Sequence, residues 1–147
     1  MDKKYTTNSY KQTQKLGEKL ATEILLSQTS QKTAVVLALK GNLGGGKTTF
    51  LQGFAKGLGI KEKITSPTFV IMKHFKFKKI NFYHFDCYRL KTAKDILELD
   101  FKEIISNPEN IVALEWPEKI KKVLSKDTVL IEFKFINENT REIKFKI

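Results

Sequence analysis

One short segment combines glycines, a lysine and a threonine at the spacing that phosphate binding requires. The pattern G-x-x-x-x-G-K-S/T is matched by Gly41, Gly46, Lys47 and Thr48. Glycines permit a close backbone approach that a Cβ atom would block, so the loop amides can point inward and cradle an anion. The Lys47 ammonium would then reach the β- and γ-phosphates, and the Thr48 hydroxyl would bind Mg²⁺. The segment predicts a loop that binds ATP and Mg²⁺, with GTP as the alternative nucleotide.

The elements expected on both sides of this loop suit the motif. Residues 33–39 form a nearly continuous apolar run, which predicts a strand buried on both faces. The pattern of residues 49–58 predicts a helix that ends at Gly59. A strand, a loop and then a helix put the anion cradle at a helix N-terminus, where the helix dipole adds attraction. This context argues against a chance match.

Two carboxylates are candidates for the other half of the site. Asp86 follows the predicted strand 80–85, and Glu115 follows the predicted buried strand 111–114. Either side chain could bind Mg²⁺ directly or through water, or orient the attacking water. Each could equally be an ordinary polar residue that closes a strand. The residues alone do not decide between these roles.

A transition-metal site is not expected, although His84, Asp86 and Cys87 are close in sequence. Zinc needs three or four ligands in fixed geometry, and the chain has no second cysteine. We expect His74 on a strand surface. Nothing in the sequence pairs Cys87 with a base, so it is not expected to act as a nucleophile.

The remaining segments complete an alternating pattern of helices and strands. Apolar periodicity predicts helices over 9–27, 95–105 and 117–124, a hairpin of strands 69–75 and 80–85, and an antiparallel pair over 129–136 and 142–147. We therefore expect an α/β fold. It would be a single P-loop NTPase-like domain over residues 1–147, with a mixed parallel and antiparallel sheet flanked by helices.

Composition bounds the class of protein. The chain has 147 residues and a formal net charge of +11, but only two of its 27 basic residues are arginines. Because nucleic-acid readers rely on the bidentate arginine fork, we favour a solvated lysine surface over a dedicated nucleic-acid groove. Weak contact with RNA or with an acidic protein stays open. The single cysteine, and the lack of a membrane-length apolar stretch or a signal-peptide pattern, favour the cytoplasm.

Beyond the generic loop, the chain resembles the bacterial TsaE family, formerly called YjeE. The resemblance rests on four motifs in the family's order, namely GNLGGGKTTF at 41–50, SPTF at 66–69, HFDCYRL at 84–90 and EW at 115–116. Members of this family are ATPases required for making threonylcarbamoyladenosine at adenosine 37 of certain tRNAs. The resemblance covers nearly the whole chain and implies the same activity here.

The resemblance also implies roles for single residues. Lys47 and Thr48 match the family's phosphate and Mg²⁺ residues, and Asp86 matches the aspartate implicated in Mg²⁺ binding and hydrolysis. Thr68 would belong to a switch loop near the γ-phosphate. Glu115 would contribute to metal binding or catalysis. The nucleotide-binding set is completed by the remaining loop residues and a tryptophan: Asn42, Leu43, Gly44, Gly45, Gly46, Thr49 and Trp116.

Three positions depart from the family's usual pattern. Asn42 stands where Asp is usual, and Gly45 stands where Ala is frequent. Asn42 lacks the charge of an aspartate near the loop, but the cradle is made of backbone, so we expect binding to survive. Asp100 stands where a Leu-Gly pair is common. This departure bears only on whether the local turn and a partner-binding surface match those of the family.

The implied partner is the TsaB–TsaD heterodimer, which transfers the threonylcarbamoyl group. ATP hydrolysis to ADP would reset that complex, so the isolated chain should hydrolyse slowly and should contact tRNA only indirectly or weakly. Such coupling requires that the ATP and ADP forms bind the partners differently. We expect residues 66–69 to be the element that changes, and we favour a monomer.

Three other functions compete with this one. A small P-loop kinase would need an acceptor pocket and usually several arginines in a lid, whereas the chain has two arginines in all. A nucleotide-regulated RNA-binding module would explain the positive charge. A GTPase would be expected to carry an N-K-x-D segment, which the sequence lacks.

Overall fold

The computed structural model describes residues 2–42, 44–65 and 71–146. Its seven-stranded sheet has the order β1-β7-β6-β2-β5-β4-β3. The strands are β1 (Lys3–Thr7), β2 (Val35–Lys40), β3 (Met72–Phe77), β4 (Ile80–Asp86), β5 (Asn110–Glu115), β6 (Val129–Phe135) and β7 (Arg141–Lys146). The central strands β6, β2, β5 and β4 are parallel, whereas β3, β7 and β1 pair antiparallel at the two sides. The predicted α/β class with a mixed sheet is confirmed.

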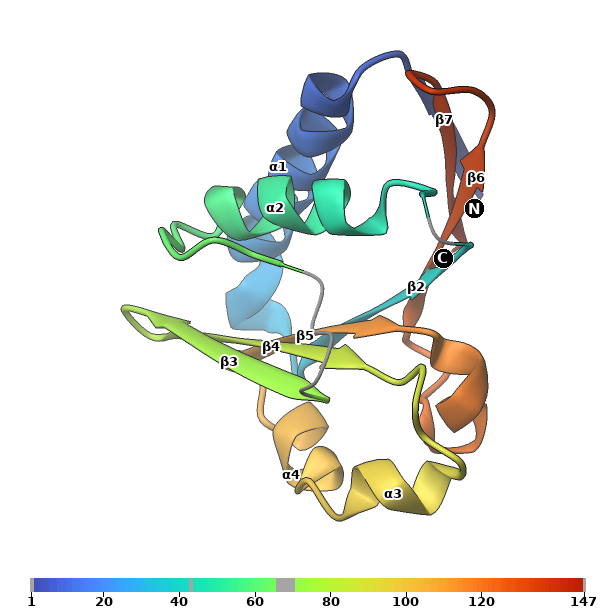
Figure 1. The fold of residues 1–147 in the computed structure, drawn as a ribbon. Helices are drawn as coiled ribbons and strands as arrows, with labels where there is room; N and C mark the ends of the chain where they lie inside the picture. The colour runs from blue at the N-terminus through green and yellow to red at the C-terminus, as the bar shows by residue number, and fades with distance from the viewer. Residues whose placement is uncertain (1, 43, 66–70, 147) are drawn as a thin grey trace.

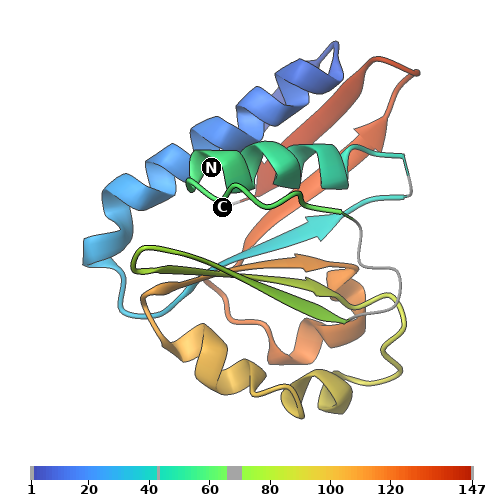
Figure 2. The ribbon, with the colours of Figure 1, turned by 60° about the vertical axis from the view of Figure 1, so that its left-hand side comes forward.

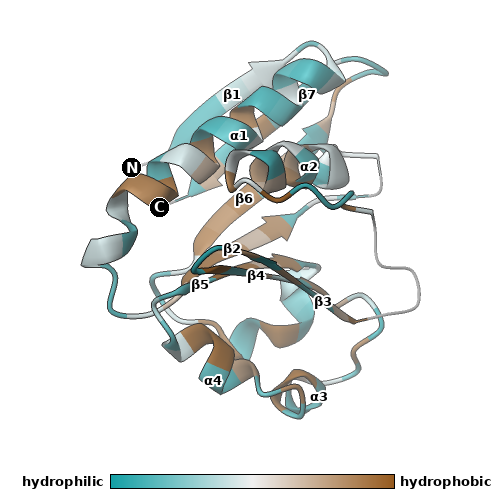
Figure 3. Ribbon diagram, turned by 90° about the vertical axis from the view of Figure 1, so that its left-hand side faces the viewer, coloured by the Kyte–Doolittle hydropathy of each residue, from teal (hydrophilic) through white to brown (hydrophobic). Residues whose placement is uncertain are grey.

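Helices cover both faces of this sheet (Figure 1). On one face lie α1 (Tyr10–Ser27), which continues into the short 3₁₀ helix η1 (Gln28–Ser30), and α2 (Lys47–Gly57). On the other lie α3 (Ala93–Leu97), α4 (Phe101–Ser106) and the 3₁₀ helix η2 (Pro117–Val123). The two layers bury separate apolar clusters, one containing Phe50 and Phe54 of α2 and the other containing Phe101 of α4. The central strands are accordingly hydrophobic, and the outer surface of α1 is largely hydrophilic (Figure 3).

The contact between α1 and α2 depends on glycines. A Cβ atom at Gly17 would overlap the Phe50 carbonyl, and one at Gly53 would overlap the Gln14 carbonyl. The two helix backbones therefore touch, which a larger side chain would prevent. Ser9 begins α1 by accepting a hydrogen bond from the Gln12 amide at 3.2 Å. Because α2 starts directly at the P-loop, this contact also fixes the loop.

The predicted helix over 95–105 is wrong in its continuity. The structure breaks it into α3 and α4, and Asp100 between them has a left-handed backbone with φ of 59°. Helical periodicity on both sides masked this turn, since apolar spacing does not report a single residue's dihedral angles. The Thr92 and Asp95 capping box also begins α3 before the predicted start.

Smaller differences occur at other elements. The segment predicted as a helix over 117–124 is the 3₁₀ helix η2, kinked at Ile120. Strand β1 is absent from the sequence prediction, because five residues at an edge carry little apolar pattern. Of the predicted strand 69–75, residues 69 and 70 lie outside the described residues, and β3 runs on to Phe77. Within the described residues, no helix has both the length and the apolar character to cross a bilayer.

Candidate nucleotide-binding site

The glycine-rich loop joins the carboxyl end of β2 to the first turn of α2 (Figure 2). Gly46 precedes the helix with φ of 98°, and Gly44 has φ of 82°. A Cβ atom at Gly44 would meet no atom within 4 Å, so the loop borders open space there. At Gly41 a Cβ atom would lie 2.6 Å from the Phe133 carbonyl of β6, so glycine is required for the loop to leave the sheet. An open backbone cradle at the N-terminus of a helix is the arrangement that binds phosphate groups.

Lys47 is the first residue of α2, and its side chain folds back across the loop. Its Nζ atom donates a hydrogen bond to the Gly41 carbonyl at 2.6 Å and lies 4.2 Å from the centroid of the Trp116 ring. Burial lowers the pKa of Lys47, and the nearby carboxylates of Glu115 and Asp86 partly oppose that change. The charge that would meet a phosphate therefore lies at the mouth of the loop.

Asp86 and Glu115 are neighbours across β4 and β5, where they are paired in register. The strand ends are held together because the Cys87 amide donates to the Glu115 carbonyl at 3.0 Å. Glu115 is 3% exposed, whereas Asp86 is half-buried. The Tyr88 amide donates to Asp86 Oδ1 at 3.0 Å, which fixes one oxygen of that carboxylate. Burial raises the pKa of Asp86, and the Tyr88 amide opposes the rise.

A residue that sequence reasoning set aside lies beside them. The Nε2 atom of His84 is 2.6 Å from Glu115 Oε2, and both side chains are buried. His84 belongs to the HFDCYRL motif at 84–90 but was given no role of its own, and a metal site with Asp86 and Cys87 was not expected; Cys87 is buried on the other side of the sheet. Strand alternation could have identified the pair. His84 and Asp86 are two residues apart on β4, so their side chains lie on the same face of the sheet, and Glu115 at the end of β5 is the neighbour of Asp86.

Trp116 caps this end of the sheet. Its backbone is left-handed with φ of 59°, which turns the chain from β5 into η2. The ring packs 5.0 Å from the ring of Tyr88, which is 59% exposed. The Trp116 ring thus contacts both the Lys47 ammonium and the Tyr88 ring.

The other predicted site residues have varied positions. Thr48 and Thr49 occupy the first turn of α2 and are partly exposed. The Asn42 carbonyl accepts the Gly45 amide at 3.1 Å, and the side chain of Asn42 is exposed. Leu43 and Thr68 lie outside the described residues. In the ranges that the structure describes, no group of three or more His, Cys, Asp and Glu residues is arranged to hold a metal ion. A magnesium ion would therefore rely on Thr48, a carboxylate, phosphate oxygens and water, as Mg²⁺ sites commonly do.

Arg141 of β7 borders the opposite side of the loop. A Cβ atom at Gly46 would lie 3.5 Å from its Cγ atom, so the side chain passes directly beside the helix start. Its guanidinium lies 4.6 Å from the Phe135 ring and donates to the Thr140 carbonyl at 3.1 Å. Arg141 is one of the chain's two arginines, and no pattern in the sequence predicts that β7 lies next to the loop.

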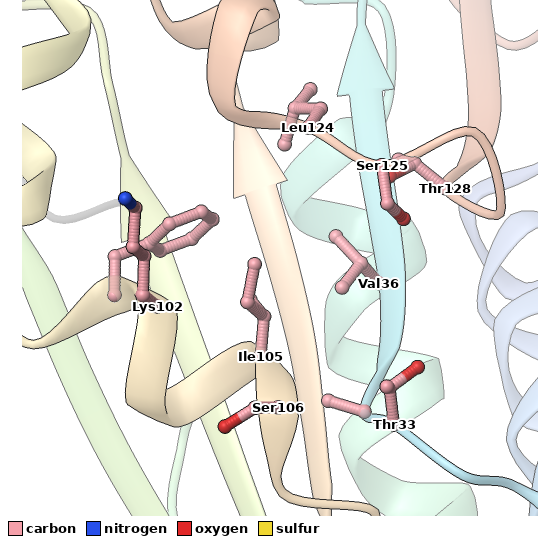
Figure 4. A pocket seen from close by; sticks show the side chains of 10 residues that line it. Thr33, Val36, Lys102, Ile105, Ser106, Leu124, Ser125 and Thr128 are labelled. Carbon is pink, nitrogen blue, oxygen red and sulfur yellow. The ribbon is translucent and has the colours of Figure 1, made fainter.

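A separate pocket of about 230 Å³ lies on the other face of the sheet, between β2, α4 and the segment before β6 (Figure 4). Val36, Ile105 and Leu124 are among the side chains that line it (Figure 4). Its lining is mostly apolar and contains one basic side chain, Lys102. A triphosphate requires many donors, so this pocket is not the candidate nucleotide site.

Comparisons with known proteins agree with this geometry. The model of the family described as "Threonylcarbamoyl adenosine biosynthesis protein TsaE" matches residues 7–143. The tRNA threonylcarbamoyladenosine biosynthesis protein TsaE of Rickettsia prowazekii is 35% identical over 138 residues, which are 93% of this chain and 90% of that protein. The protein of the same name from Bacillus subtilis is 37% identical over 120 residues, covering 82% of this chain and 74% of that protein.

A solved structure has the same fold. The crystal structure of YdiB from Bacillus subtilis superposes with a TM-score of 0.73 at 31% sequence identity, covering 99% of this chain and 84% of that chain. The resemblance inferred from the four motifs is thus confirmed by the family match, by the relatives and by the fold. The chain belongs to the TsaE family of threonylcarbamoyl adenosine biosynthesis proteins.

Proposed function

We propose that this chain binds ATP with Mg²⁺ and hydrolyses it to ADP in support of threonylcarbamoyladenosine formation on tRNA. The observation that carries the proposal is the convergence of Lys47, Asp86 and Glu115 at the mouth of the glycine-rich loop. A P-loop supplies phosphate binding, and hydrolysis needs in addition a carboxylate for the metal and a group that orients water. Residues that could supply each of these parts lie at one end of the sheet, which supports the proposal.

Phosphate binding would begin with Lys47. The Gly41 carbonyl and the Trp116 ring hold its ammonium in the present conformation. The β- and γ-phosphates offer stronger, charge-assisted hydrogen bonds than a carbonyl does, so the ammonium would turn toward them. The amides of the loop and of the first turn of α2 would then surround the phosphates.

Thr48 and Asp86 are the residues that we propose to hold Mg²⁺. Bound there, the ion would neutralise charge on the β- and γ-phosphate oxygens during transfer. The Tyr88 amide bonds Oδ1 of the Asp86 carboxylate, and among the described residues no hydrogen bond is made to its second oxygen, which would serve the ion. Trp116 would border the nucleotide, and Thr68 is retained as a candidate switch residue next to the γ-phosphate.

We further propose that the TsaB–TsaD heterodimer is the partner and that hydrolysis resets it between turnovers. The chain would then be a slow ATPase alone, because a switch must hold its ATP form long enough to act. Contact with tRNA would be indirect or weak, and the working compartment would be the cytoplasm. ATP is preferred over GTP in this proposal because no N-K-x-D segment is present.

A calorimetric titration with ATP and Mg²⁺ tests the nucleotide site. Wild-type protein should bind ATP, Lys47→Ala should show no measurable binding, and Asp86→Ala should keep much of the binding but lose phosphate release. Undiminished hydrolysis by Asp86→Ala would show that Asp86 does not hold the Mg²⁺ ion needed for hydrolysis. Wild-type protein that is folded but does not bind ATP would overturn the whole proposal.

A further inference from the structure

A buried hydrogen bond beneath the candidate site has no role in the proposal so far. His84 Nε2 and Glu115 Oε2 are 2.6 Å apart, and the two side chains are 0% and 5% exposed. His84 lies two residues before Asp86 on β4, on the face that packs toward α2 with Phe82. A polar pair is costly to bury, so an isolated pair at the end of a core strand calls for a reason other than stability.

The second ring nitrogen identifies how the pair is bonded. His84 Nδ1 is buried and has no hydrogen-bond partner among the described residues. A buried N–H without an acceptor leaves a strong donor unsatisfied, whereas a bare ring nitrogen leaves only an acceptor. The least costly arrangement therefore carries the ring hydrogen on Nε2, which donates it to Glu115 Oε2.

This arrangement fixes Glu115 in one orientation. The donor engages Oε2 and leaves Oε1 able to accept a hydrogen bond from another group. The Lys47 ammonium lies close enough to both Glu115 and Asp86 to interact with their carboxylates electrostatically. Asp86 differs, because it is half-buried and accepts a hydrogen bond from the Tyr88 amide at Oδ1.

We infer that His84 is a positioning residue, which holds Glu115 so that its carboxylate orients the water that attacks the γ-phosphate. This inference rests on the proposed function. It assigns the two roles that the sequence left undecided: Glu115 orients the attacking water, and Asp86 binds Mg²⁺. In the step itself the water oxygen bonds to the γ-phosphorus while the bond to the bridging oxygen breaks and leaves its electrons on ADP. One water proton stays on the inorganic phosphate, and the other is released to solvent. Glu115 contributes by accepting a hydrogen bond from a water that is already aligned.

The test compares two replacements of His84 in the full chain. His84→Leu removes the donor, whereas His84→Gln places an amide N–H near the position of Nε2. The readouts are ATP affinity by calorimetry and the single-turnover rate of hydrolysis with Mg²⁺. We expect His84→Leu to lower the rate by about 10–100-fold, the usual loss when a supporting hydrogen bond is removed, with affinity little changed. His84→Gln should recover most of the rate.

A double-mutant cycle separates positioning from a general structural effect. If His84 acts only through Glu115, then His84→Leu should cause no further loss of rate in a Glu115→Gln background. The matched control is His74→Gln at the chain's other histidine, an exposed residue of β3 whose Nε2 lies 2.9 Å from Asn81 Oδ1. Its rate and affinity should match those of the wild type. Far-UV circular dichroism and thermal unfolding would establish that each variant is folded.

The outcomes are distinct. Multiplicative losses in the cycle, or loss of rate in His84→Gln equal to that in His84→Leu, would overturn the positioning role. Unchanged hydrolysis by His84→Leu would also overturn it and would leave the proposed function standing. Wild-type protein that binds ATP but never hydrolyses it, alone or with its partners, would overturn the proposed function itself.

Discussion

The ammonium of Lys47 lies 4.2 Å from the centroid of the Trp116 ring, so the residue expected to bind phosphate rests against the only tryptophan in the chain. A cation over an indole face is attracted by about 0.5–2 kcal/mol, depending on how far it is desolvated. The same ammonium is bonded to the Gly41 carbonyl. Nucleotide binding must therefore rearrange contacts at Trp116.

Trp116 emission should report that rearrangement. Adding ATP with Mg²⁺ is expected to change the intensity or wavelength of tryptophan fluorescence saturably, because the charge next to the indole moves. Lys47→Ala should abolish the nucleotide dependence, and Trp116→Phe should abolish the signal. An unchanged spectrum in wild-type protein that binds ATP by calorimetry would show that Lys47 keeps its place over the ring.

The two adjacent glycines of the loop should tolerate alanine differently. Gly46 has φ of 98°, where an L side chain is strained by roughly 1–2 kcal/mol. Gly45 has no positive φ, and a Cβ atom there would be 3.1 Å from the Asn42 carbonyl, a contact that a small shift relieves. Gly46→Ala should thus weaken ATP binding by about tenfold or more, since 1.4 kcal/mol is a factor of ten. Gly45→Ala should bind nearly as wild type, and equal losses in both variants would contradict this.

The sequence predicted those parts of the site that depend on local chain geometry. The motif Gly41 to Thr48 carries its own strand-loop-helix context, and Asp86 and Glu115 were identified as strand ends that the structure places next to each other. Contacts that depend on tertiary packing were missed. Arg141 beside Gly46 comes from a strand whose neighbours the chain order does not reveal, whereas the contact of His84 with Glu115 follows from strand alternation once β4 and β5 are neighbours.

In the fold, too, elements with a long local pattern were predicted, whereas features set by single residues or by distant pairing were missed. Long periodic segments such as α1 and the apolar runs of β2 and β5 were predicted, since they bury continuous surface. The break at Asp100 was not, because one left-handed residue interrupts a helix without changing the apolar pattern. The edge strand β1 is added by pairing with β7, a contact between the two ends of the chain.

Asp100 offers a stability test of that break. Its φ of 59° and exposed side chain mean that backbone strain, rather than packing, should dominate substitutions there. Asp100→Val should be less stable than Asp100→Gly by about 1–2 kcal/mol, because a β-branched residue is strained in the left-handed region. Urea unfolding measures the difference. At Glu98, whose φ is −69°, Glu98→Gly should not be more stable than Glu98→Val. An equal advantage for glycine at Glu98 would contradict backbone strain as the cause at Asp100.

Cys87 should be chemically silent in the folded protein. Its side chain is fully buried, and burial raises the pKa of the thiol to about 12. The reactive thiolate is therefore scarce at pH 8, so modification by iodoacetamide should be slow until the chain unfolds. In denaturant the single cysteine should react at the rate of a free thiol. Fast modification of the native protein at pH 8 would contradict both the burial and the raised pKa.

Phosphate release from ATP tests the central claim most directly. It should be measured with the purified protein alone, and with TsaB and TsaD from the same source, in the presence of Mg²⁺. We expect slow release by the isolated chain, strong stimulation by the pair, and loss of both in Lys47→Ala. Absence of stimulation, in a folded protein shown to bind ATP, would contradict it.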